Sequence, residues 1–515
     1  MVISTPRFGY QRLTSGFVII LLSEQRRSAP GRRKGQFVSI KHYTPRKTTM
    51  TTADLPFDYL IGPTACVAAP DVVRSIRQEV KEQRALSLGD IRLATAMGLL
   101  STDSLRTIGF NDGVFYALEE SVSRAPASLS APTEMVRLGT KSKQRTMHAL
   151  ALMVDFSDNP GVRPKADFQA LLFDAQNPDS MASYYAQLSG GVLTVTGEVI
   201  GYIRAPRPYS HYTNGQSGTG ENFPQNTPGL LKDVLDVYCQ TDTLNRFDLN
   251  HDGYVDGVFL IHAGGGAEAE ADPNLRPHKI WSHKWVLPTA FEHNGIKVFA
   301  YSTEPEDGHV GVFAHEFGHV LGLPDLYDSS YRSHGIGDWC LMAGGSWGGQ
   351  GDHPVRMSCW CLAKLGWLKP QPVQHPMAIE LRPLAEDPAA CYQVWPNKKK
   401  GPEYFLVECR QKTGQDAALP GAGLAIWHID ETQSSNNNPL GYQVALVQAD
   451  GKRDLEYNRN SGDAGDLFPG TKKVTAIDDN TVPSTRVNMG AASGISFRGI
   501  AYSARQGKAT FTIEV

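Results

Sequence analysis

The feature that most constrains this chain is a pair of histidines four residues apart, in the stretch "GVFAHEFGHVLGLPDLYD" from residue 311 to 328. In an α-helix, residues i and i+4 lie on the same face, so His315 and His319 can direct both imidazoles at one point. Glu316 lies beside them, where its carboxylate can reach a water held at that point. The run also fits a helix that simply packs as core, with its polar residues incidental. The residues after the helix decide between these two interpretations.

Those residues favour a metal site. Gly322 follows His319 by three positions, where glycine lets a helix end and the chain reverse. The reversal brings Asp325 back towards the histidines. Two neutral imidazoles, one carboxylate and an open fourth position form the arrangement that catalytic zinc needs. We therefore predict that His315, His319 and Asp325 bind zinc.

Further motifs resemble those of the immune inhibitor A family of bacterial zinc metallopeptidases. The run His315–Asp325 matches H-E-x-x-H-x-x-G-x-x-D, and "GIGDWCLMAGGSWG" supplies Met342 where metzincin-like peptidases have their Met-turn. The stretches "ASYYAQLSGGVLTVTG", "DLNHDGYVDGVFLIHAG", "IWSHKW" and "GAGLAIWHID" extend the resemblance over most of residues 146–515. It implies the same three zinc ligands, Glu316 as general base and Met342 in the hydrophobic base beneath the metal.

The function implied is that of a zinc-dependent metalloendopeptidase, which hydrolyses peptide bonds of proteins by a zinc-activated water with Glu316 as general base. Tyr327 is a candidate oxyanion donor, although a packing role explains it as well. One alternative is an inert peptidase-like protein that binds a surface or a carbohydrate, against which the intact Glu316 argues. Another is a zinc amidohydrolase acting on non-peptide amides. An extended cleft favours the peptidase, and a closed pocket favours the amidohydrolase.

Composition excludes several other classes of function. The chain has 515 residues, of which 41% are hydrophobic and 20% are charged, as in soluble globular proteins. Its net charge of −3 gives no sign of a nucleic-acid partner. No apolar run approaches the ~20 residues that span a bilayer, so we expect no transmembrane anchor. We expect a monomer that acts on protein or peptide substrates.

The first 49 residues form a basic extension or result from a start site assigned too early. They contain Glu24 as their one acidic residue and a short apolar core, "FVIILL". A secretory signal needs a longer apolar region and a small-residue cleavage site, and this stretch is marginal on both counts. Met50 is the start that we favour. The family resemblance implies an extracellular protein, and that expectation conflicts with the absence of a convincing export signal.

The rest of the chain divides into three predicted parts, giving an α+β fold. Residues 50–140 are expected to form a prosegment with a helix that begins near Pro70. Residues 141–370 alternate strands and helices and form the metzincin-like zinc peptidase domain. Residues 371–515 contain strand-like runs separated by turns, which predicts a β-rich, sandwich-like C-terminal domain. The strand "KVFAYSTE" just before the metal helix is expected either to form the rim of the cleft and pair with substrate or to be a plain core strand.

We predict a structural calcium site in "DLNHDGYVDG", which begins like an EF-hand loop, with oxygen ligands at alternate positions and a glycine for the sharp turn. No glutamate stands at position 12, so the loop is not a true EF-hand, and Asx-rich turns of this kind also occur without metal. The candidate ligands are Asp248, Asn250, Asp252, the carbonyl of Tyr254, and Asp256. The acidic stretch "NRNSGDAGDLF" is a second candidate.

Cys66 stands alone in "GPTACVAAPD", ahead of the catalytic region. A thiolate is a soft ligand that would fill the fourth position of zinc and keep the enzyme latent as a zymogen. The segment resembles the cysteine-switch propeptides of other metzincins but lacks their arginine, and an inert buried cysteine is the alternative. The chain has seven cysteines, an odd number, and Cys359 and Cys361 are too close along a predicted helix to form a disulfide with each other.

Overall fold

The computed structural model describes residues 63–81 and 145–515. The predictions for residues 1–49, and for most of the segment 50–140, concern residues outside these ranges. The predicted helix after the prosegment cysteine is present as α2, Pro70–Lys81. None of the described helices has the length and apolar character of a membrane span.

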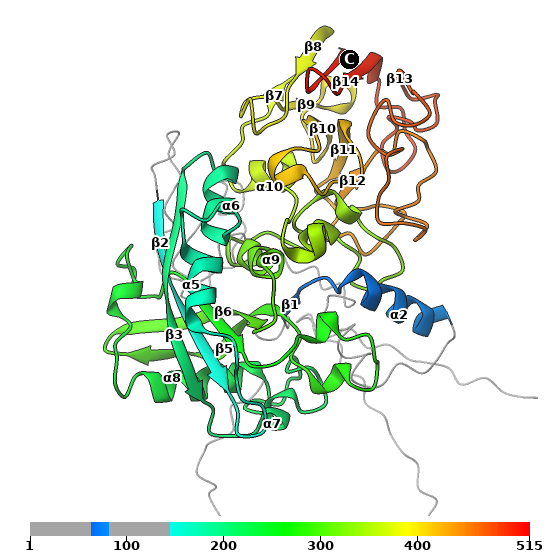
Figure 1. Cartoon of the computed structure of the whole chain (residues 1–515). Coiled ribbons are helices and arrows are strands. Elements are labelled where there is room, and N and C mark those ends of the chain that lie inside the picture. Colours follow the sequence, from blue (N-terminus) through cyan, green and yellow to red (C-terminus); the bar gives the residue numbers. More distant parts are fainter. Residues whose placement is uncertain (1–62, 82–144) are drawn as a thin grey trace, which may run out of the picture. The chain divides into compact units, whose positions relative to one another are not determined.

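The catalytic region is built on a six-stranded sheet with the order β1-β5-β6-β4-β2-β3. Its strands are β1 Thr64–Ala65, β2 Arg145–Asp155, β3 Leu193–Arg204, β4 Val258–His262, β5 His283–His293 and β6 Ile296–Pro305. Strands β3, β2, β4 and β6 run parallel, whereas β5 is antiparallel to β6 and β1 is antiparallel to β5. The sheet is thus parallel in its body and antiparallel at the side where β1 lies (Figure 1).

Helices cover both faces of this sheet, as expected for parallel strands. Along β2, Ala149 and Ala151 enter one apolar core, and the alternate residues Leu150 and Leu152 enter another. Helices that pack on the sheet contribute side chains to each of these cores. The helices on the first face are α5 Lys165–Phe173, α6 Met181–Leu188 and α9 Val310–Val320, and those on the second are α7 Tyr209–Thr213 and α8 Thr227–Tyr238. The first face therefore holds the metal helix α9.

The strand "KVFAYSTE" lies in β6 and is a core strand, the second of the two alternatives expected for it, and not the rim of the cleft. Strand β6 has β4 on one side and β5 on the other, so its main chain is already paired. The reason is a hairpin: Asn294 and Gly295 both have positive φ, at 52° and 84°, which is the geometry of a tight two-residue turn between antiparallel strands. Because of this turn, β5 and β6 lie side by side in the sheet. β5 occupies the position next to β6 and pairs on its other side with β1.

The C-terminal region is rich in strands, as predicted, and the chain as a whole mixes helix and sheet. One sheet, ordered β12-β11-β10-β9-β7, contains β7 Gln371–Pro372, β9 Tyr392–Val394, β10 Glu403–Arg410, β11 Gly423–Asp430 and β12 Val444–Leu446. The other, ordered β13-β14-β15-β8, contains β8 Met377–Leu381, β13 Ala476–Ile477, β14 Ser496–Ser503 and β15 Lys508–Glu514. Helix α10, Cys359–Lys364, joins the catalytic and C-terminal regions and contacts β10. One continuous apolar core runs through both regions.

Candidate metal centre

The metal helix α9 is completely enclosed: every residue from Val310 to Val320 is buried. It ends where the sequence predicts, because Gly322 takes a φ of +94° that other residues rarely adopt. The amide of Gly322 donates to the carbonyl of His319, and the amide of Leu323 donates to that of Gly318. These bonds complete the last turn and reverse the chain towards the helix.

The reversal brings the three predicted zinc ligands together. The Nε2 atoms of His315 and His319 are 3.1 Å apart. The Oδ1 atom of Asp325 lies 3.2 Å from the first and 3.1 Å from the second. Ligands at about 2.05 Å from a tetrahedral metal are about 3.3 Å from one another. The three atoms therefore form a triangle of nearly the size that bound zinc requires.

The hydrogen bonds of the two imidazoles also fit a metal. The Nδ1 atom of His315 lies 2.8 Å from the carbonyl of Leu341, and that of His319 lies 2.7 Å from the carbonyl of Leu323. A carbonyl only accepts, so each Nδ1 carries the proton and each Nε2 presents a lone pair. Two lone pairs and a carboxylate then face one point, which is an unfavourable arrangement without a cation.

Met342 lies under the helix, as the resemblance implies. A Cβ atom on Gly318 would lie 2.5 Å from the Sδ atom of Met342, so glycine at this position permits the close approach. The carbonyl of Met342 accepts from the amide of Leu326, at 2.7 Å, just after the third ligand. The carbonyl of the preceding residue, Leu341, contacts His315. The turn at residues 341–342 therefore supports the helix that carries the histidines and the segment that carries Asp325.

Glu316 is fully buried beside the triangle. Burial raises the pKa of its carboxyl, and the neighbouring carboxyls of Glu304 and Asp325 raise it further. The main-chain amide of Lys284, on β5, lies close enough to act against this rise as a hydrogen-bond donor. The carboxylate thus lies near both His315 and the main chain of β5.

Cys66 reaches the same place from the N-terminal segment. Its Sγ atom, a ring nitrogen of His315 and a carboxylate oxygen of Glu316 all lie within 4.8 Å of one another. The thiol is completely buried, and burial raises its pKa well above the usual value. All seven cysteines are free thiols, and Cys359 and Cys361 do not pair, as predicted.

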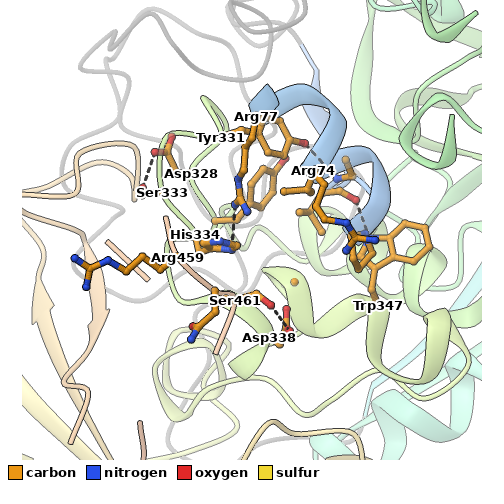
Figure 2. A pocket seen from close by; sticks show the side chains of 18 residues that line it. Arg74, Arg77, Asp328, Tyr331, Ser333, His334, Asp338, Trp347, Arg459 and Ser461 are labelled. Atoms are coloured by element: carbon orange, nitrogen blue, oxygen red, sulfur yellow. Dashed lines mark hydrogen bonds between the residues drawn. The ribbon is translucent and has the colours of Figure 1, made fainter. Parts of the chain in front are cut away.

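The segment around Cys66 is fixed to the catalytic region on both sides. Tyr327, the candidate oxyanion donor, donates its hydroxyl to the carbonyl of Ala65 at 2.8 Å. Further along, Arg77 of α2 places its Nη2 atom 3.1 Å from the Nδ1 atom of His334 (Figure 2). Between α2 and the catalytic region lies a cavity of about 270 Å³. Tyr327 therefore forms a polar contact beside the metal ligands in addition to its packing.

The predicted calcium ligands lie in one loop before β4. Gly253 has a φ of +87°, which makes the sharp turn. The carboxylate of Asp248 accepts from the amides of Asp252 and Gly253, and that of Asp256 accepts from the amides of His148 and Leu249. Hydrogen bonds between its carboxylates and main-chain amides thus hold the loop in place. Burial raises the pKa of Asp256 to about 6, and the neighbouring carboxylates add to the rise.

In the second acidic stretch, "NRNSGDAGDLF", one aspartate clusters with acidic residues from outside the stretch. Asp463 lies with Asp450 and Asp454, whose carboxylate oxygens come within 4.8 Å of one another. Asp466 instead accepts a hydrogen bond from the indole of Trp339, at 3.2 Å. The amine of Lys452 lies 2.6 Å from Asp450 and already supplies a positive charge to the cluster.

Two indole groups near Cys66 escaped the sequence analysis. The Nε1 atom of Trp281 donates to the carbonyl of Cys66, at 2.8 Å, and that of Trp347 donates to the carbonyl of Val67, at 2.9 Å. Trp281 lies within the "IWSHKW" motif, and its position in that motif could have marked it as a functional residue. Glu304 was also missed, although a lone carboxylate at the end of the apolar strand β6 is unusual.

Comparison with known proteins agrees with this geometry. Residues 135–367 match the family model described as "Immune inhibitor A peptidase M6, catalytic domain". Residues 135–367 are thus similar to the catalytic domain of the immune inhibitor A family. The chain is 33% identical over 290 residues to "Immune inhibitor A" of Bacillus thuringiensis subsp. alesti, covering 47% of this chain and 41% of that protein. It is 30% identical over 272 residues to "Pre-pro-metalloprotease PrtV" of Vibrio cholerae serotype O1, covering 42% of this chain and 29% of that protein. The matches thus span less than half of either relative.

Proposed function

We propose that this chain is a zinc-dependent metalloendopeptidase that hydrolyses peptide bonds of proteins. The observation that carries the proposal is the triangle of His315, His319 and Asp325, with sides of 3.1 to 3.2 Å. Zinc bound there would polarise the scissile carbonyl and lower the pKa of the attacking water. The printed name of the Vibrio relative, a metalloprotease, points to the same class of activity.

Glu316 is the general base in this proposal. Its carboxylate takes the proton from the attacking water and then delivers it to the leaving amine of the cleaved bond. Burial favours this role because it raises the pKa of the carboxyl towards the range in which a group both accepts and returns a proton. Met342 and Leu341 hold the ligand-bearing segments beneath the site.

The alternative functions fit the geometry less well. A non-peptide amidohydrolase would bind a small substrate in a closed pocket. Here an extended segment, with β1 paired to the edge of β5, runs past the metal ligands. An inert binding protein would not need Glu316 enclosed beside the ligands. Peptide and protein substrates are therefore the partners we propose, and the family resemblance supports an extracellular site of action.

Latency through Cys66 is part of this proposal. The thiol lies within 4.8 Å of His315, on the side where Glu316 and the attacking water must meet. A thiolate there would replace the water in the fourth ligand position. Removing the prosegment would withdraw the sulfur and admit both water and substrate. The inert alternative accounts less well for a lone cysteine at this position.

Calcium in the loop 248–256 completes the proposal. Burial, together with the charges of Asp248 and Asp252, raises the pKa of Asp256 to about 6. Ca²⁺ binds such clusters of oxygen atoms and would relieve the repulsion. Strand β4 begins at Val258, two residues after the loop, so the ion would stabilise the start of a central strand.

The test is hydrolysis of casein by the full chain before and after limited trypsin treatment, with and without a zinc chelator. We expect cleavage after trypsin that the chelator abolishes and that zinc restores. Glu316→Gln should bind zinc in the same amount while losing at least about a hundredfold in rate, since loss of a general base costs about 10²–10⁴-fold. The matched control is Glu380→Gln, an exposed carboxylate on β8. Full activity of Glu316→Gln would overturn the general-base role.

A further inference from the structure

The segment before α2 follows the edge of β5 as an added strand. Strand β1 pairs with the first residues of β5 in antiparallel register. The amide of Cys66 continues the pairing by donating to the carbonyl of Ser282, at 2.8 Å. Extended peptides bind at sheet edges by this kind of main-chain pairing. The segment therefore lies along the edge strand in the way a peptide substrate would, with Cys66 at the metal ligands.

Four aromatic side chains hold the main chain of this segment. They contact four consecutive residues: Tyr327 Oη donates to Ala65 O at 2.8 Å, Trp281 Nε1 to Cys66 O at 2.8 Å, Trp347 Nε1 to Val67 O at 2.9 Å, and Tyr331 Oη accepts from Ala68 N at 3.2 Å. Every contact is made to a peptide group and none to a side chain. The same groups would hold any extended peptide, whatever its sequence.

We propose that Thr64–Ala69 marks the path of the substrate main chain, and that the cleft selects peptides with a small side chain at the position of Ala65. This inference rests on the proposed peptidase function and names its substrate class. Ala65 is 1% exposed and precedes Cys66, the residue at the metal ligands. Peptides with alanine, glycine or serine at this position are the class that fits.

The restriction at Ala65 follows from the rings that hold it. The side chain of Tyr327 is almost fully buried and is fixed by its bond to the Ala65 carbonyl, and Trp281 is completely buried. Because Ala65 is 1% exposed, a large side chain in place of its methyl group would have to displace the buried groups around it and disturb these main-chain contacts. Overfilling a closed, well-packed site is unfavourable for this reason.

The position of Val67 provides an internal comparison. Val67 and Ala68 border the cavity of about 270 Å³, whereas Ala65 is not among the residues that line it. The far wall of the cavity comes from α2, including Val73 and Arg77, so it opens further when the prosegment leaves (Figure 2). A large side chain should therefore be tolerated at the Val67 position and rejected at the Ala65 position.

The test uses the full chain after trypsin treatment and three internally quenched peptides. The first copies residues 63–69 with serine in place of the cysteine, and the others carry phenylalanine at the Ala65 position or at the Val67 position. We expect phenylalanine at the Ala65 position to lower kcat/KM at least about tenfold, and at the Val67 position less than about threefold, since only the first overfills a closed site. Casein hydrolysis is measured in parallel.

Each outcome separates the two proposals. Cleavage of casein together with the expected ranking of the peptides supports both. Cleavage of casein with equal rates for all three peptides, or with none of them cut, overturns the substrate path and leaves the peptidase function in place. Failure to cleave casein, with zinc bound, overturns the peptidase function and with it the substrate class derived from it.

Discussion

The sulfur of Cys66 and the imidazole of His315 lie within 4.8 Å of each other, together with the carboxylate of Glu316, although 249 positions separate the two residues along the chain. The contact joins the segment before α2 to the residues that we propose bind zinc and activate water. The latency that we propose depends on this contact.

Cys66→Ser should therefore release activity in the unprocessed full chain. Serine is a poor zinc ligand compared with a thiolate, so water can enter the fourth position. We expect casein hydrolysis at least about tenfold above the parent. The main-chain contacts of the segment remain, so activity should stay below that of the trypsin-treated protein. Cys239→Ser, a half-buried cysteine at the end of α8, is the control. A variant as inactive as the parent would show that Cys66 does not keep the enzyme latent.

Asp325→Ala tests the third ligand. The change removes one of three atoms that lie 3.1 to 3.2 Å from one another, leaving two imidazoles that bind zinc weakly. We expect zinc affinity to fall by more than about a hundredfold, because even loss of groups that only support ligands costs 10–100-fold. The measurement is zinc content after dialysis against a competing chelator, with Asp352→Asn, an exposed carboxylate, as control. Unchanged zinc content would mean that another residue completes the site.

Local parts of the site could be predicted from the sequence because they depend on neighbouring residues. The four-residue spacing of His315 and His319 requires only a helix, and Gly322 requires only a turn. The structure brings Asp325 to the histidines through that turn. The Asn294–Gly295 hairpin was equally local, and because it was overlooked the rim and core alternatives for the strand "KVFAYSTE" both stayed open.

The contacts of the prosegment could not be predicted in the same way. Strand β1 has two residues and no distinctive pattern, so its pairing with β5 depends on the shape of the completed sheet edge. The donors Trp281 and Trp347 come from segments far apart in sequence and meet only at the main chain of residues 66 and 67. Small residues around Cys66 give no sequence signal that distinguishes a buried strand from an exposed one.

Calcium should stabilise the parent and not Asp252→Ala. Asp252 is the least enclosed of the three loop carboxylates, so removing it disturbs the main chain least. We expect the Tm of the parent to rise by several degrees in millimolar calcium, since a bound ion stabilises the folded state alone. The rise should be absent in Asp252→Ala and kept in Asp236→Ala, an exposed carboxylate on α8. The same rise in both variants would mean that calcium binds elsewhere.

Acid should weaken the contact between α2 and the catalytic region through His334. Burial, together with the charge of Arg77, lowers the pKa of His334 from 6.5 to about 3. Below about pH 6.5, His334 becomes protonated in the unfolded chain but stays neutral in the folded chain. The stability that depends on neutral His334 is therefore complete above about pH 6.5 and is lost as the pH falls towards 3.

His334→Gln isolates this effect, because glutamine keeps an acceptor for Arg77 and does not titrate. The measurement is the Tm of the full chain at pH 7.5 and at pH 5. We expect the parent to lose more Tm over this interval than His334→Gln, while His353→Gln, an exposed histidine, behaves as the parent. Buried His262 and His283 also resist protonation, but they are present in all three proteins and cancel in the comparison. Equal losses in the parent and in His334→Gln would show that the Arg77–His334 contact does not set the acid sensitivity.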